Sequence, residues 1–154
     1  MKDKGLRLKI CGMRDADNIA EVCALGVDYL GFIFYKHSPR YVGKNFSMPS
    51  VPASTKRVGV FVNEPAAAIA RIAERFGLDL VQLHGNESPE VCAEIRQVNV
   101  GVIKTFSVGD NTDFKITAPY HGTADYFLFD TKGKYFGGNG IAFNWDLLQD
   151  YDQV

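Results

Sequence analysis

A carboxylate, Asp130, ends an apolar run in the segment DYFLFDTKGK, residues 125–134. The four residues before it, 126–129 (YFLF), are typical of a buried β-strand. A carboxyl group at the end of such a strand lies where water meets the core, and the loss of water favours its neutral, protonated form. Asp130 is therefore a candidate general acid, although a helix cap or an ion pair would place a carboxylate in the same way.

Other polar side chains end other apolar runs. Cys11 ends the segment LRLKIC, and Lys9 precedes it by two residues, which places both on one strand face. Gln82 and His84 share a face in the same way near the end of LVQLHG. A thiolate can act as a base, and an imidazole can exchange a proton near neutral pH. On residue type alone, Cys11 is equally a small buried side chain, Lys9 an ion-pair partner and His84 a structural hydrogen-bonding residue.

A glycine-rich segment, residues 133–140 (GKYFGGNG), follows Asp130. The backbone N–H groups of such a loop can bind a phosphate group, which makes Gly137 and Gly138 candidate contacts. A plain flexible loop fits the same composition.

Composition excludes several classes of protein. The 154 residues are 46% apolar and 23% charged with a net charge of −1, as in an ordinary globular chain, so no nucleic-acid partner is indicated. No apolar run approaches the ~20 residues of a membrane span, and the N-terminus lacks a signal peptide. The three cysteines have neither disulfide nor metal-ligand spacing, which predicts free thiols and no metal site. We expect one cytoplasmic domain over residues 1–154, with no membrane partner.

Six apolar runs recur about every 24 residues, which is the spacing of strand–helix units. They begin near Leu6, Tyr29, Arg57, Leu80, Gly101 and Asp125. Helix signals lie between them: Asp15 or Asp17 before a helix that ends at Gly26, Pro65 before one that ends at Gly77, and Ser88 with Pro89 before a third. Two prolines in segment 43–56 exclude a long helix there, and segment 110–120 has room only for a short one.

Strands that alternate with helices predict a parallel α/β sheet. Two architectures compete at this point. The length favours an open, doubly wound sheet of flavodoxin size, a fold that would suit a binding domain. Polar residues on one strand face, in particular Cys11, His84 and Lys104, favour a barrel, because the interior of a barrel near its mouth can hold such groups.

Six motifs, in order and at the ends of expected strands, resemble phosphoribosylanthranilate isomerase. They are KICGMRD (9–15), GFIFYKHSPRYV (31–42), VGVFVNEP (58–65), LVQLHGNES (80–88), IKTFSV (103–108) and LFDTKG (128–133), the last followed by GGNGIAFNW (137–145). The resemblance extends from about Leu8 to about Leu148. It implies an α/β fold of the TIM (β/α)8-barrel family.

The resemblance also implies a reaction, the Amadori rearrangement of N-(5-phosphoribosyl)anthranilate to an aminodeoxyribulose phosphate in tryptophan biosynthesis. Asp130 matches the general acid of the family, Cys11 the general base, and Arg40 the residue that binds the anthranilate carboxylate. Gln82, His84, Gly137 and Gly138 are the further residues expected near the phosphosugar–anthranilate substrate. No cofactor and no metal are implied.

The sequence departs from the family in its length. Six strand–helix units account for the 154 residues, so we expect an incomplete barrel without the last two units. The loops after the seventh and eighth strands build the phosphate site in such barrels. We therefore expect a homodimer or a complementing C-terminal segment, and a catalytically incompetent fragment remains the alternative to an active isomerase.

Overall fold

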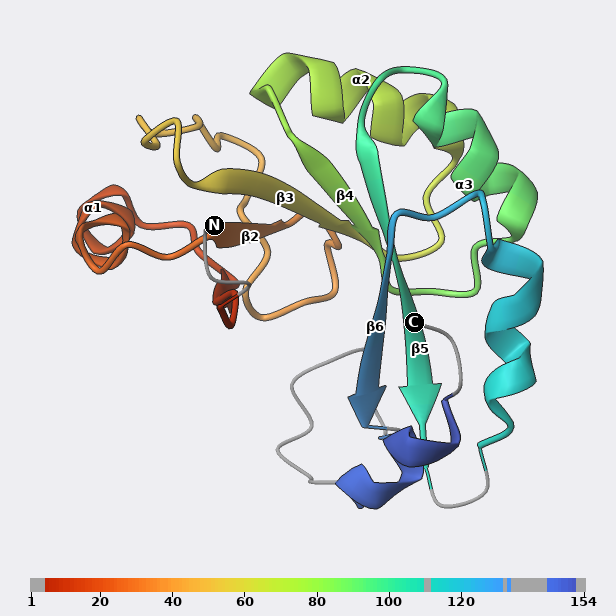
Figure 1. Ribbon diagram of the computed structural model, residues 1–154. Helices are drawn as coiled ribbons and strands as arrows, with labels where there is room; N and C mark the ends of the chain where they lie inside the picture. The colour runs from red at the N-terminus through yellow and green to blue at the C-terminus, as the bar shows by residue number, and fades with distance from the viewer. Residues whose placement is uncertain (1–4, 110–111, 132, 134–143, 152–154) are drawn as a thin grey trace.

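The computed structural model describes residues 5–109, 112–131, 133 and 144–151 of the chain. Strands and helices alternate along it, except that β3 follows β2 with no helix between them (Figure 1). The elements are β1 (Lys9–Cys11), α1 (Ala16–Ala24), β2 (Tyr29–Ile33), β3 (Lys56–Phe61), α2 (Ala66–Phe76), β4 (Leu80–Leu83), α3 (Pro89–Arg96), β5 (Gly101–Val108), the 3-10 helix η1 (Phe114–Tyr120), β6 (Tyr126–Thr131) and the 3-10 helix η2 (Trp145–Asp150).

The strands form one parallel sheet in the order β1-β2-β3-β4-β5-β6. An open, doubly wound sheet needs a point at which the strand order reverses, and this sheet has none over the described residues. The flavodoxin-like alternative is therefore wrong. Strands that add one after another, each connected on the same side, form a (β/α) half-barrel.

The helices begin and end where the sequence predicts. The Asp15 carboxylate accepts a hydrogen bond from the backbone N–H of Asn18 at 3.0 Å and so caps α1. Helix α2 follows Pro65 and ends at Gly77, which has the left-handed backbone conformation, φ 57°, of a helix C-terminus. Pro89 opens α3, where its missing N–H costs nothing. These helices carry the chain from the end of one strand to the start of the next.

The main core lies between the outer face of the sheet and the three α-helices. Fully buried Phe32, Leu83 and Val102 of the strands pack there with Ile19 of α1 and Ile69 of α2. Figure 1 shows α2, α3 and η1 along this side of the sheet. Over the described residues, no α-helix packs on the opposite, inner face of the strands (Figure 1).

A second, smaller cluster occupies the inner face. Val58, Leu80 and Ile103 of three successive strands pack with Tyr29 and Leu128. Because strand residues alternate between faces, Asp130 shares the inner face with Leu128 and points away from Phe127 and Phe129. Residues from β2 and β6 meet in this cluster although three strands separate them, so the sheet curls around it.

Arg7, just before β1, supports the same curvature. Its Nη1 donates a hydrogen bond to the Tyr29 hydroxyl at 2.8 Å, and its guanidinium also bonds the side chain of Tyr126 at the start of β6. These hydrogen bonds raise the pKa of Arg7. The two ends of the sheet therefore approach each other on the side where the strands begin.

One strand begins later than expected. Strand β1 begins at Lys9 rather than near Leu6, and the side chains of Leu6 and Leu8 are exposed. Residues 145–150 form the 3-10 helix η2 near the ends of β5 and β6 (Figure 1). The short helix expected within 110–120 is confirmed as η1.

Within the described part of the chain, no helix is long and apolar enough to span a membrane.

Candidate active site

Asp130 lies near the carboxyl end of β6 and is bonded to His84. The His84 Nε2 atom is 3.1 Å from Asp130 Oδ2, and the side chains are 11% and 29% exposed. The carboxyl group thus combines partial burial with access to solvent, as a general acid requires. The apolar alternation of the strand places it there, since Leu128 and Asp130 face inward while Phe127 and Phe129 pack outward on Phe106.

Gln82 supports the other side of the His84 ring. Its Nε2 lies 2.9 Å from His84 Nδ1, and the residue is 3% exposed. Burial lowers the pKa of His84 below 6.5 and outweighs the nearby Asp130 charge, which raises it. The imidazole is therefore neutral near pH 7.

Cys11 ends β1 on the inner face and is half-buried. Its strand neighbour is Gly31 of β2, and a side chain at that position would collide with it: a Cβ atom on Gly31 would lie 2.6 Å from Cys11 Sγ and 3.0 Å from Lys9 Nζ. The thiol and the ammonium group thus occupy the space that the glycine leaves. Among the described residues Lys9 makes no ion pair, so the expected partner is not found there.

Arg40 reaches Cys11 from the loop after β2. Its Nη1 donates a hydrogen bond to the Cys11 carbonyl oxygen at 3.1 Å, and the residue is exposed. The guanidinium lies over Gly12, where a Cβ atom would approach Arg40 Cδ to 2.7 Å and where φ is 91°. Glycine at position 12 therefore allows a cation to lie against the backbone at the end of β1, with donors left to bind a ligand.

The groups of β1 and β6 face the same interior. Lys9 of β1 lowers the pKa of His84 through its charge, while His84 is bonded to Asp130. The predicted acid and the strand that carries the predicted base therefore face the same interior near the carboxyl ends of the strands, and Arg40 lies beside the end of β1. This is the edge at which parallel α/β folds bind their ligands.

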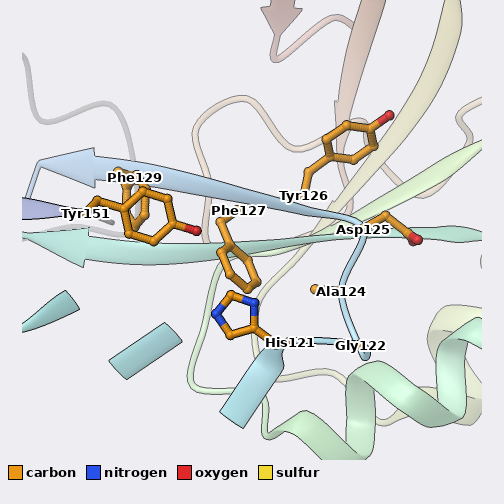
Figure 2. A pocket seen from close by; sticks show the side chains of 8 residues that line it. All are labelled: His121, Gly122, Ala124, Asp125, Tyr126, Phe127, Phe129 and Tyr151. Carbon is orange, nitrogen blue, oxygen red and sulfur yellow. The ribbon is translucent and has the colours of Figure 1, made fainter. Parts of the chain in front are cut away.

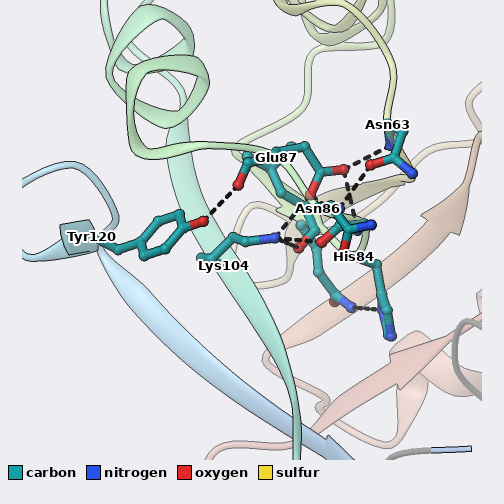
Figure 3. A network of polar contacts seen from close by, with 9 residues as sticks. Asn63, His84, Asn86, Glu87, Lys104 and Tyr120 are labelled. Atoms are coloured by element: carbon teal, nitrogen blue, oxygen red, sulfur yellow. Dashed lines mark hydrogen bonds and ion pairs between the residues drawn. The ribbon is translucent and has the colours of Figure 1, made fainter. Parts of the chain in front are cut away.

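A buried ion pair supports the loops behind this space (Figure 3). Lys104 Nζ lies 2.9 Å from Glu87 Oε2, with side chains 3% and 2% exposed, and it also donates to the Gly85 carbonyl oxygen at 2.7 Å. Glu87 accepts hydrogen bonds from the backbone N–H of Gly85 and of Asn63, at the ends of β4 and β3. The network holds the chain directly after His84.

Lys104 therefore corrects one expectation. We expected it on the inner, polar face, but it pairs in register with Leu83 of the outer core and lies on the helix side of the sheet. Side chains of a strand alternate between its two faces. Because Ile103 and Thr105 of β5 face inward, Lys104 between them faces outward. Its charge is neutralised by Glu87 rather than directed at the candidate site.

A pocket of about 390 Å³ lies elsewhere, on the outer side of β6 (Figure 2). His121, Phe127, Phe129 and Tyr151 are among its lining residues, and Figure 2 shows the His121 ring facing Phe127. The pocket lies on the opposite face of the strand from Asp130 and takes no part in the candidate site.

The remaining predictions divide into two groups. The cysteines are free thiols, as predicted; Cys92 is buried, which raises its pKa to about 11, and Cys23 is half-buried. Gly137 and Gly138 lie outside the described residues.

Our sequence reasoning missed Gly12 and Gly31. The signals that could have identified them are a glycine directly after the candidate base and a glycine inside a strand.

Comparison with known proteins adds an independent line of argument. The sequence profile of the family described as N-(5'phosphoribosyl)anthranilate (PRA) isomerase matches residues 8–154. The N-(5'-phosphoribosyl)anthranilate isomerase of Phocaeicola vulgatus is 44% identical over 144 residues, which cover 94% of this chain and 69% of the relative.

Solved structures of the same family superpose on this chain. The phosphoribosyl anthranilate isomerase of Thermotoga maritima superposes with a TM-score of 0.79 at 33% identity, over 96% of this chain and 72% of the other. Another phosphoribosyl anthranilate isomerase, solved in complex with reduced 1-(o-carboxyphenylamino)-1-deoxyribulose 5-phosphate, superposes with a TM-score of 0.61 at 28% identity, over 81% of this chain and 75% of the other. The profile match over nearly the whole chain, the relative and the shared half-barrel lead to one conclusion: this chain belongs to the phosphoribosylanthranilate isomerase family.

Proposed function

We propose that this chain catalyses the Amadori rearrangement of N-(5'-phosphoribosyl)anthranilate, with Asp130 as general acid and Cys11 as general base. The observation that carries the proposal is that His84, which is bonded to Asp130, is also affected by the charge of Lys9, two residues before Cys11 on β1. The family membership supplies the substrate class.

The proposed reaction is an isomerisation, so substrate and product contain the same atoms, and it begins with two proton transfers made by the protein. Asp130 donates a proton to the ring oxygen of the sugar, the bond from that oxygen to C1 breaks, and the nitrogen lone pair forms a C=N bond. Cys11, as a thiolate, then removes the proton from C2, which gives an enolamine that tautomerises to the ketone. An acid and a base on opposite strands of a curled sheet can reach the two sides of a small sugar.

Arg40 orients the substrate in this proposal. Its guanidinium is exposed, is held beside Cys11 by a single bond to the backbone, and retains N–H donors that can bind the anthranilate carboxylate in a bidentate manner. Arg40→Lys keeps the charge but loses the planar pair of donors. We expect it to raise KM more than it lowers kcat.

The two edge strands of the sheet bear on the oligomeric state of the chain. In the described part of the chain β1 and β6 are the edge strands, and Tyr126 of β6 is 47% exposed. Unpaired edges favour association with another chain. We propose that a second copy covers them, and light scattering after size-exclusion chromatography tests this, because a monomer over a hundredfold range of concentration contradicts it.

The experiment for the main proposal is direct turnover. Phosphoribosylanthranilate is fluorescent and its loss is followed with the purified chain, with a protein-free sample as the control for spontaneous decay. Product formation that stops in Asp130→Asn and Cys11→Ser supports the proposal. A folded wild-type chain that does not convert the substrate contradicts it and favours the catalytically incompetent alternative.

A further inference from the structure

Three side chains form a continuous polar chain on the inner face: Gln82 of β4, His84 directly after β4, and Asp130 of β6. We propose that His84 is a positioning residue for the acid: its Nε2–H holds one oxygen of Asp130, so that the proton to be delivered stays on the other oxygen. Gln82 selects the ring tautomer that makes this possible. The proposal rests on the proposed role of Asp130 as general acid.

The tautomer follows from what each group can donate. Whether Asp130 is ionised or carries its proton on the other oxygen, Oδ2 only accepts a hydrogen bond, so the His84 Nε2 atom 3.1 Å away carries the hydrogen. A neutral ring then has a bare Nδ1, and the Gln82 amide nitrogen, 2.9 Å away, donates to it. This amide nitrogen cannot accept a hydrogen bond, so it opposes the alternative tautomer.

This arrangement leaves one polar atom of Gln82 without a hydrogen bond. Its Oε1 is buried and finds no hydrogen-bond partner within the described part of the chain. Native proteins rarely leave a buried acceptor unsatisfied, because each one destabilises the fold. Gln82 leaves its Oε1 unsatisfied but keeps the hydrogen bond from its Nε2 to His84. We attribute this to its role in orienting the His84 ring.

The charges around the ring keep it neutral. Burial is the main cause of the lowered His84 pKa, and Lys9 of β1 lowers it further, while Asp130 of β6 and Glu87 of the loop after β4 raise it. A protonated ring would donate from both nitrogens, in conflict with Gln82, and would hold Asp130 as a carboxylate. The neutral ring leaves the acid free to carry its proton.

The hydrogen bond strengthens during the reaction. When Asp130 delivers its proton it becomes charged, and a bond to a charged acceptor is about twice as strong as a neutral one. An interaction that is stronger in the transition state than in the ground state raises kcat rather than lowering KM. Loss of the His84 donor should therefore lower kcat about 10- to 100-fold with little change in KM.

The first measurement is nuclear magnetic resonance of the wild-type imidazoles. The chain has three histidines, and the spectrum of His84→Gln identifies the signals of His84 by their absence. We expect nitrogen shifts of the Nε2–H tautomer at pH 7 and a titration midpoint below 6.5. The Nδ1–H tautomer, or a midpoint above 6.5, would overturn the proposal without any assay of activity.

The second measurement compares kinetics. His84→Leu removes the donor, whereas His84→Gln places an amide N–H near the Nε2 position and should restore kcat to within about fivefold of wild type. His121→Gln, an exposed histidine on the outer side of β6, is the matched control. A rise in KM in both His84 variants with kcat unchanged would make His84 a substrate contact and overturn the proposal. A wild-type chain without turnover would instead refute the proposed function, while the tautomer measurement would still decide the ring's orientation.

Discussion

Gly31→Ala should separate activity from stability. The added Cβ atom would lie 2.6 Å from Cys11 Sγ, whereas carbon and sulfur atoms in contact prefer at least ~3.5 Å, so the thiol must retreat by roughly 1 Å. A misplacement of about 1 Å at a reacting group can cost about a hundredfold in rate. The clash costs about 1–3 kcal/mol of stability, and alanine recovers about 0.5–1 kcal/mol of the entropy that glycine loses in a strand. We therefore expect kcat to fall about a hundredfold while the free energy of unfolding falls by no more than ~2.5 kcal/mol.

The assay combines three readouts: turnover of phosphoribosylanthranilate, urea unfolding, and the rate at which a thiol reagent modifies Cys11. Gly101→Ala is the matched control, because Gly101 lies on the inner face at the start of β5, far along the sheet from Cys11. A Cβ atom there would lie 3.3 Å from the flexible side chain of Leu80 and 3.6 Å from Asp125 Oδ2, and neither contact is a severe clash. A folded Gly31→Ala variant with activity within threefold of wild type would refute the argument that the glycine makes room for the thiol.

Three further predictions address the acid, the thiols and the buried ion pair. Asp130→Asn removes the proton source and should lower kcat by at least the ~10²–10⁴-fold typical of general-acid loss, so a variant as active as wild type would exclude Asp130 from the mechanism. Cys11 should react with a thiol reagent faster than Cys92, whose pKa of about 11 leaves little thiolate at pH 8, and substrate should protect it; equal and slow labelling of the thiols would count against the base. Lys104→Met leaves the Glu87 carboxylate buried and unpaired and should lower the free energy of unfolding by about 3–5 kcal/mol, with partial recovery in the double variant Lys104→Met/Glu87→Gln; a single-variant loss below ~1 kcal/mol would contradict the role of the pair.

The architecture was largely predictable because it depends on repeated local signals. The six apolar runs, the Asp15 cap and the Gly77 helix end each act within a few residues, and each was confirmed. The position of Asp130 was predictable for the same reason, because an apolar strand that ends in a carboxylate can be seen within one short segment.

The arrangement around these residues was less predictable because it depends on register between distant strands. The contact of Gly31 with Cys11 follows from the pairing of β1 with β2, and the bond of His84 to Asp130 joins residues 46 apart. Lys104 shows the same limit: a lysine within a strand does not reveal its face, and Glu87 decides the outcome from another loop. Residue type gave the candidates, and strand pairing determined their partners.

The central claim is that Cys11 and Asp130 act together on phosphoribosylanthranilate, and steady-state turnover by four proteins tests it most directly: wild type, Cys11→Ser, Asp130→Asn and the double variant. If each group performs an obligatory proton transfer in one reaction, the wild-type chain converts the substrate, each single variant loses at least about a hundredfold in kcat, and the double variant is scarcely slower than the slower single variant. A folded wild-type chain with no turnover, or single variants that retain wild-type rates, would contradict the account.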